Sequence, residues 1–228
     1  MIIKKGDFVE LEYIGRLQED GKIFDLTSEE LAKKEKIHNP HGRYGPRIIC
    51  VGEGHIVKGI DEFLVGKSVS HHTVPLSPDQ AFGKKNAKLM KIVPSSVFKK
   101  QHMKPFPGLH VNFDGYVGTI KTVSGGRVIV DFNHPLAGRG VVYDVTVKRV
   151  VTDVKEKVGS YLALLFGKDT SYSIEKGIVS LSLSLPDNAQ RHLQESMKRV
   201  IPEIKDVLFE EKKKREDTAG KKATADNR

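Results

Sequence analysis

Two strand-like segments that lie far apart in the sequence constrain the fold of this chain most strongly. Residues 2–17 and residues 140–150 both alternate apolar and polar side chains, which is typical of a half-buried strand. Residues 85–133 between them hold shorter strand patterns separated by turns at Asp114-Gly115 and Ser124-Gly125-Gly126, and they predict a small antiparallel module. The second long strand has no partner in that module. We therefore expect it to close the sheet that the first strand begins, with the module inserted into a loop.

The first domain carries local signals for its other elements. Asp20-Gly21 predicts a hairpin turn, after which residues 22–25 form the returning strand. The pair Thr27 and Glu30 matches a capping box and predicts a short helix through Lys36.

A third region begins near Thr152. Asp153 and Glu156 predict a helix cap, and the helix that follows ends at Gly167. A hairpin is then predicted around Lys176-Gly177.

The last part of this region has helical spacing from Pro186 to Phe209, with a kink expected at Pro202. The resulting α-β-β-α unit has a small core, and its apolar strand face favours docking onto a second copy of the chain. The polar, charge-mixed sequence after Glu210 predicts a flexible tail.

The composition limits the classes of function. The 228 residues are 38% hydrophobic and 29% charged, as in a globular protein. We ascribe the formal net charge of +9 to a solvated, lysine-rich surface, because no RNA- or DNA-binding module is recognisable. The single cysteine, Cys50, excludes an intrachain disulfide. No segment has the length and hydrophobicity of a membrane span or a secretion signal, so we expect a cytoplasmic protein.

Residues 51–64 form the most informative local pattern. A glycine-rich turn, Gly52-Glu53-Gly54, leads into a short amphipathic helix in which Ile56 and Ile60 lie on one face. Ile56 and Val57 stand at the helix entrance, where backbone N–H groups have no partner within the helix. The segment therefore predicts an apolar pocket with a spare amide donor.

This segment and two others together resemble the FKBP-type peptidyl-prolyl isomerases. The others are Lys22-Ile23-Phe24-Asp25 and Pro78-Asp79-Gln80-Ala81-Phe82-Gly83. The resemblance implies an α+β fold in which an antiparallel sheet wraps around a short helix. It also implies an enzyme that accelerates cis–trans isomerisation of X-Pro bonds, a reaction that needs no metal, cofactor or nucleophile.

By the same resemblance, ten residues would line the proline socket. The Val57 N–H would hold a substrate carbonyl, Ile60 would be the floor, and Asp25 would order the pocket through hydrogen bonds. Taken singly, Phe24 or Tyr143 could be core aromatics, but the shared order and spacing of the set favour the functional interpretation. The ten are Tyr13, Phe24, Asp25, Ile49, Ile56, Val57, Ile60, Phe82, Leu136 and Tyr143.

The chain departs from many relatives at two of these positions. Ile60 stands where they often have tryptophan, and Phe82 stands where they often have tyrosine. We expect the missing tyrosine hydroxyl at position 82 to weaken tight binding of macrolide drugs more than it affects isomerisation.

Residues 131–138, Asp-Phe-Asn-His-Pro-Leu-Ala-Gly, resemble the exit from the insert-in-flap domain of SlyD-type members. In those relatives the insert binds unfolded chains, so the resemblance implies holdase-type chaperone activity. SlyD-type proteins often end in a histidine-rich metal-binding tail, but residues 212–228 contain no histidine, and we expect no metal site. The apolar residues expected to form the client surface are Val93, Val97, Phe98, Met103, Phe106 and Leu109.

The sequence thus predicts four parts. They are an isomerase domain at 1–85 and 134–151, an inserted β-rich chaperone domain at 86–133, a C-terminal α+β domain at 152–211, and a tail at 212–228. The third part resembles the long archaeal branch of the family, in which such a domain supports dimerisation.

Expected partners are unfolded or partly folded polypeptides with X-Pro bonds and a second copy of the chain, with neither membrane nor nucleic acid. Two alternatives stay open. One is a non-catalytic chaperone or binding module with a vestigial isomerase pocket, motivated by Ile60 and Phe82. The other is a basic ribosome- or RNA-associated folding factor, motivated by the charge of +9.

Overall fold

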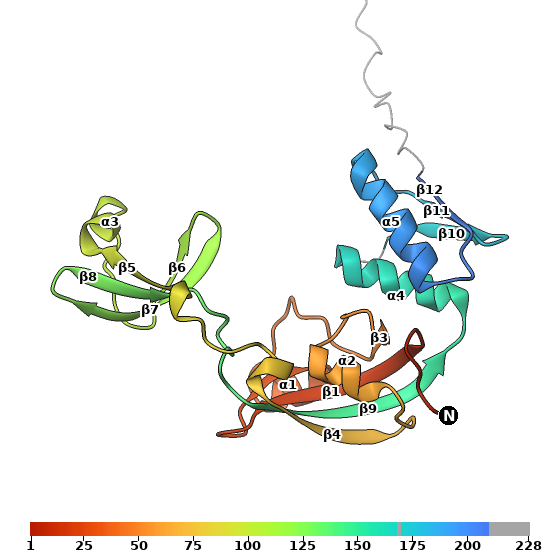
Figure 1. Ribbon diagram of the computed structural model, residues 1–228, viewed down its shortest axis with the longest axis horizontal. Coiled ribbons are helices and arrows are strands. Elements are labelled where there is room, and N and C mark those ends of the chain that lie inside the picture. The colour runs from red at the N-terminus through yellow and green to blue at the C-terminus, as the bar shows by residue number, and fades with distance from the viewer. Residues whose placement is uncertain (168–169, 210–228) are drawn as a thin grey trace, which may run out of the picture. The chain divides into compact units, whose positions relative to one another are not determined.

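The computed structural model of the chain describes residues 1–167 and 170–209. It divides into two compact units, the first ending at Val151 and the second beginning at Thr152. The first unit contains two sheets, which we call the main sheet and the insert sheet (Figure 1). No helix among the described residues is long and apolar enough to cross a membrane.

The main sheet confirms the pairing expected between the two long strands. β1 (Phe8–Leu17) and β9 (Val141–Val151) pair antiparallel along their whole lengths. The order is β2-β1-β9-β4, and β3 also pairs with β1. The remaining strands are β2 (Ile23–Leu26), β3 (Arg47–Cys50) and β4 (His71–Leu76).

The helix α2 (Lys58–Leu64) covers the core of the main sheet. It buries Ile60 and Leu64 completely. Gly59 permits the close approach, because a Cβ there would lie 2.5 Å from Leu76 Cδ2 and 2.9 Å from the carbonyl oxygen of Gln80. The hydrophobic rhythm of residues 56–64 therefore predicted the helix and the burial of Ile60 correctly, but Ile56, expected on the same helix face, precedes the first helical residue.

The short helix α1 (Glu29–Lys34) is capped differently from the prediction. Ser28 is the N-cap, and its hydroxyl accepts a hydrogen bond from the Leu31 N–H at 3.2 Å. The capping box assigned to Thr27 is wrong. The Thr27 hydroxyl instead accepts from the Tyr13 N–H at 3.0 Å, which ties this segment to β1.

The insert has a four-stranded antiparallel sheet in the order β5-β8-β7-β6 and a core of its own. The hairpins around Asp114-Gly115 and residues 124–126 are confirmed. A strand and a helix were not predicted: β5 (Met90–Pro94) and α3 (Ser95–Lys100). The other strands are β6 (His110–Phe113), β7 (Tyr116–Ser124) and β8 (Arg127–Asp131). Two single 3-10 turns precede them, η1 (Pro78–Gln80) and η2 (Ala87–Leu89).

In the second unit the first helix follows the prediction. In α4 (Val154–Phe166) the Asp153 carboxylate accepts from the Glu156 N–H at 2.7 Å, and Gly167 ends the helix in the left-handed conformation. The predicted hairpin is also present, with β10 (Tyr172–Glu175) antiparallel to β11 (Ile178–Leu181).

The prediction for the end of this unit is wrong. The helix α5 (Asp187–Val200) stops before Pro202, and residues 206–209 form a strand, β12 (Asp206–Phe209), parallel to β11. The order is therefore α-β-β-α followed by one more strand. The tail predicted for residues 212–228 lies outside the described residues.

Candidate functional site

The predicted site residues gather on one side of the main-sheet core. Three of the ten are part of the buried core itself: Ile49, Ile60 and Tyr143. Six more are partly buried and pack against that core. Those six are Tyr13, Phe24, Ile56, Val57, Phe82 and Leu136.

Four aromatic rings form a continuous series through this candidate socket. Tyr13 and Tyr143 have ring centroids 5.8 Å apart, and Tyr143 and Phe24 lie 5.6 Å apart. Phe24 then meets Phe82 at 5.7 Å. All three contacts are edge-on, which is a favourable arrangement for aromatic pairs. The rings come from β1, β9, β2 and the loop after η1, so they are brought together only by the tertiary fold.

Gly15 makes room for these rings. A Cβ at this position would lie 2.8 Å from Tyr143 Cε1 and 3.0 Å from Phe24 Cζ. The sequence analysis did not include Gly15 among the site residues. Its signal was a lone glycine inside an alternating strand, which often marks close approach of another group.

A carboxylate also fixes the turn that leads into α2. Both oxygens of buried Asp61 accept backbone hydrogen bonds, from Gly52 at 2.7 Å and from Gly54 at 2.9 Å. The turn ends at Val57, the N-cap of α2, which lacks a side-chain cap. The Val57 N–H donates to no acceptor among the described residues, so this amide is a donor at the edge of the socket.

The polar part of the socket consists of Asp25 and two tyrosines. Burial raises the pKa of Asp25, while hydrogen bonding to Tyr13 and the positive charge of Arg47 oppose that rise. Burial and then the charge of Asp25 raise the pKa of Tyr13 to about 12. Tyr13 therefore stays a neutral hydrogen-bond donor throughout the physiological range.

The Tyr143 hydroxyl is the least satisfied group in the socket. It is buried and has no hydrogen-bond partner of good geometry among the described residues. Burial raises the pKa of Tyr143, and the Asp25 carboxylate raises it further through its charge. A buried hydroxyl without a partner costs about 1–3 kcal/mol, so a ligand that supplied an acceptor would recover that free energy.

One further residue at the rim was missed by the sequence analysis. The imidazole of His134 stacks on Phe82, with centroids 4.7 Å apart and an interplanar angle of 1°. Its Nδ1 accepts from the Leu136 N–H at 3.2 Å, which orients the segment that carries Leu136. The sequence analysis placed His134 only in residues 131–138, the segment that leaves the insert.

The six apolar residues proposed for the insert surface are not equivalent. Phe98 is completely buried and belongs to the insert core, so its assignment to an exposed surface is wrong. Phe106 is well exposed. The other four are half-buried: Val93, Val97, Met103 and Leu109.

Among the described residues, no group of three or more His, Cys, Asp or Glu side chains could hold a metal ion. The side chains gathered around Tyr143 supply an apolar, aromatic environment with a few hydrogen-bond donors.

Comparison with known proteins agrees with this geometry. The family model described as FKBP-type peptidyl-prolyl cis-trans isomerase matches residues 1–99, and the one described as FKBP26, IF domain, matches residues 91–136. The short-type peptidyl-prolyl cis-trans isomerase of Methanocaldococcus jannaschii is 34% identical over 150 residues, which cover 65% of this chain and 94% of that protein.

Bacterial relatives show the same relationship over shorter stretches. A probable FKBP-type 16 kDa peptidyl-prolyl cis-trans isomerase of Pseudomonas fluorescens is 34% identical over 45% of this chain and 71% of its own length. The FKBP-type isomerase SlyD of Vibrio cholerae is 30% identical over 47% of this chain and 55% of its own length.

The chain belongs to the FKBP-type peptidyl-prolyl cis-trans isomerases. It is an enzyme of that class, and it carries an insert-in-flap domain.

Proposed function

We propose that the aromatic socket binds the proline of an X-Pro bond and lowers the barrier to its rotation. The observation that supports this most is the series of four aromatic rings, Tyr13, Tyr143, Phe24 and Phe82, which belong to or pack against the same core as the fully buried Ile60. A proline ring is compact and apolar, and such a socket can enclose it without leaving polar groups of the substrate unpaired.

The proposed mechanism needs only binding and exclusion of water. The barrier to rotation, about 18–20 kcal/mol, comes from amide resonance. In the twisted transition state this resonance is lost and the carbonyl is less polar. An apolar socket therefore favours the twisted amide over the planar one, which water solvates better.

Two donors position the substrate in this proposal. The free Val57 N–H holds the carbonyl of a neighbouring peptide unit, and the Tyr143 hydroxyl supplies a second contact inside the socket. Asp25 acts on Tyr13 and Tyr143 rather than on the substrate, because its carboxylate can orient both hydroxyls through hydrogen bonds.

Substitution of Phe24 tests the assignment of the socket. With Phe24→Leu we expect kcat/KM for a short proline peptide to fall on the order of tenfold, equivalent to about 1.4 kcal/mol. Phe63→Leu is the matched control, because Phe63 packs against the same core but its ring contacts His72 and Lys67. Equal activity of the two variants would contradict the assignment.

We also propose that residues 86–133 capture unfolded chains and pass them to the socket. Exposed apolar side chains of the insert support this, notably Phe106 and Ile92. Replacing both by serine should weaken suppression of protein aggregation several-fold and leave the rate on a short proline peptide unchanged. If aggregation were suppressed as before, the insert would not be the capture surface.

For the second unit we propose homodimerisation, in a cytoplasmic setting. The support is apolar surface at Leu165 and Leu208, both 49% exposed. Light scattering should give twice the chain mass for the intact protein and a single chain mass after truncation at Val151. A monomeric intact chain would refute the proposal.

A further inference from the structure

The insert carries most of the net charge of the chain. Residues 86–133 include seven basic and two acidic residues, a formal charge of +5 out of the total of +9. The seven are Lys88, Lys91, Lys99, Lys100, Lys104, Lys121 and Arg127. The excess is therefore concentrated in one small domain rather than spread evenly over the surface.

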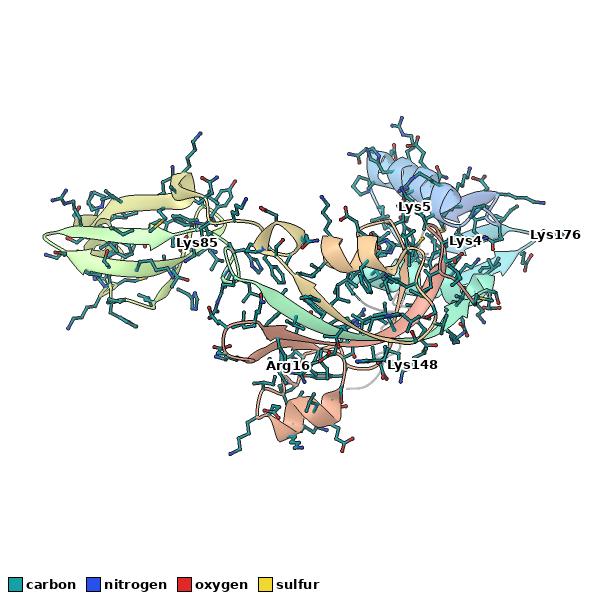
Figure 2. The ribbon with its side chains drawn as sticks, turned by 60° about the horizontal axis from the view of Figure 1, so that its bottom comes forward. Lys4, Lys5, Arg16, Lys85, Lys148 and Lys176 are labelled. Atoms are coloured by element: carbon teal, nitrogen blue, oxygen red, sulfur yellow. The ribbon has the colours of Figure 1, made fainter. Side chains whose placement is uncertain are left out.

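Almost none of this charge is neutralised within the domain. Asp131 is only 6% exposed, and it accepts hydrogen bonds from both the backbone and the side chain of Asn133. Lys121 lies 3.8 Å from it. No other basic residue of the insert forms an ion pair with any described residue. Lys85, labelled in Figure 2 where the chain enters the insert, adds another cation near Asp131.

The same domain exposes an apolar sheet face. Val128 and Val130 of β8 point into the insert core, so Ile129 between them points to the opposite side, where it pairs with Ile92 of β5. We call this side the open face. Its exposed apolar members are Met90, Ile92 and Val117, which are 42%, 64% and 63% accessible.

Cations border the open face. Arg127 is directly opposite Pro94 at the end of the β5–β8 pair, on the same side as Ile129 and Ile92, whereas Lys91 pairs with Val130 and points to the other side. Lys121 reaches the open face through its contact with Asp131. Arg127 and Lys121 thus border the exposed aliphatic groups of the open face.

We propose that the insert selects client segments in which apolar residues are interspersed with Asp and Glu, and that it disfavours segments rich in Lys and Arg. The inference rests on the proposed capture function and names the class of segment captured. The open face would bury the apolar side chains, and the bordering cations would pair with the carboxylates.

The exposed aliphatic groups favour a polypeptide over a nucleic acid. Single-stranded nucleic acids bind by stacking their bases on aromatic rings along a basic groove. Met90, Ile92 and Val117 cannot stack in that way, but they can bury aliphatic side chains of an unfolded protein. The exposed rings of the insert lie off the open face: Phe106 is in the loop before β6, and Tyr116 alternates with Val117 in β7. The charge complementarity therefore points to an acidic polypeptide.

The test compares two labelled peptides by fluorescence anisotropy with the intact protein. Both have the same apolar residues and length and contain no proline, and they differ only in having Glu or Lys at the intervening positions. The Glu peptide should bind on the order of tenfold more tightly at low salt, because several weak surface pairs add together. The difference should shrink in 0.5 M salt, where the Debye length is only a few ångströms.

A charge variant locates the effect. Lys85→Gln, Lys121→Gln and Arg127→Gln together should remove most of the preference for the Glu peptide. The matched control is Lys155→Gln, Arg191→Gln and Lys205→Gln, which removes the same charge from exposed positions in the second unit and should preserve it.

Each contrary result has a different meaning. Equal binding of both peptides would overturn charge selection while leaving capture intact. Binding of neither would overturn the capture function itself. Tighter binding of an unstructured 20-nucleotide RNA, with displacement of the Glu peptide, would show that the basic surface serves nucleic acid.

Discussion

The main sheet and the insert differ in how far their charged side chains are paired and in how much apolar surface they expose. In the main sheet Arg16 is paired with Asp144, and Lys148 with Glu12 at 2.7 Å (Figure 2). Its apolar side chains form a core of fourteen buried residues. The insert has a core of five buried residues and exposes aliphatic groups, and most of its cations form no ion pair with any residue that the structure describes.

This difference matches two different tasks. A socket that distinguishes a twisted amide from a planar one must hold its walls in place, which a large core and paired charges achieve. A surface that accepts many unfolded chains needs accessible apolar groups and charges not already satisfied. The small core of the insert implies that it opens more readily than the main sheet.

The largest expected effect is local unfolding of the insert. Phe98→Ala removes the largest side chain of its core and should cost about 3–5 kcal/mol, comparable to the whole stability of so small a domain. Hydrogen exchange should show loss of protection in residues 90–131 only, with activity on short proline peptides retained. Phe106→Ala, at an exposed site, is the control. Simultaneous unfolding of the main sheet would contradict the separation of the two regions.

The next effect concerns the unsatisfied hydroxyl in the socket. Tyr143→Phe should leave stability nearly unchanged, because among the described residues the buried hydroxyl makes only a poorly aligned contact with the Asp25 carboxylate. Activity on short proline peptides should nevertheless fall by up to about tenfold if this hydroxyl holds the substrate. Urea unfolding and kinetics on the same samples separate the two quantities. A destabilised variant with unaltered kcat/KM would assign the hydroxyl a structural role instead.

The pH dependence of the free energy of unfolding should distinguish Asp25 from Asp114 of the insert. Because burial raises the pKa of Asp25 in the native state, the native protein binds this proton more readily than the unfolded chain. The free energy of unfolding should therefore contain a contribution that falls as pH rises from the ordinary Asp range through the raised pKa. Asp25→Asn should remove that fall in urea titrations, and Asp114→Asn in the insert should not. Identical pH profiles for wild type and Asp25→Asn would contradict the account.

The smallest effect comes from surface ion pairs of the main sheet. Arg16→Gln breaks the pair with Asp144 and should cost about 0.2–1 kcal/mol in urea unfolding at low salt. Lys104→Gln on the insert should cost nothing measurable, because that lysine is exposed, lies outside the helices and strands, and has no ion-pair partner among the described residues. Equal losses for the two variants would remove the electrostatic contrast between the regions.

Much of the fold could be predicted from local patterns. The alternation in residues 140–150 required a partner outside the inserted module, and β1 supplies it. The Asp153 cap and the Gly167 end of α4 also follow from local chemistry alone. The end of the second unit could not be predicted. In the sequence Leu208 and Phe209 continue the helical spacing, but α5 ends at Val200, before Pro202, and both residues belong to β12.

Only part of the site was predicted, because local patterns do not show which distant segments meet in the fold. The aromatic residues stood in recognisable segments, but the contributions of Gly15, Asp61 and His134 depend on neighbours distant in the chain or on loop geometry. The buried position of Phe98 was likewise hidden, because α3 is only six residues long and too short to show a helical period.

The most direct test of the account measures refolding of a protein whose rate is limited by proline isomerisation. It compares the intact chain with a form lacking residues 86–132, and activity on a short proline peptide verifies that the shortened form is folded. We predict strong acceleration by the intact chain and loss of that acceleration on deletion, with short-peptide activity retained. Equal acceleration by both forms would contradict the proposal that the insert delivers clients to the socket.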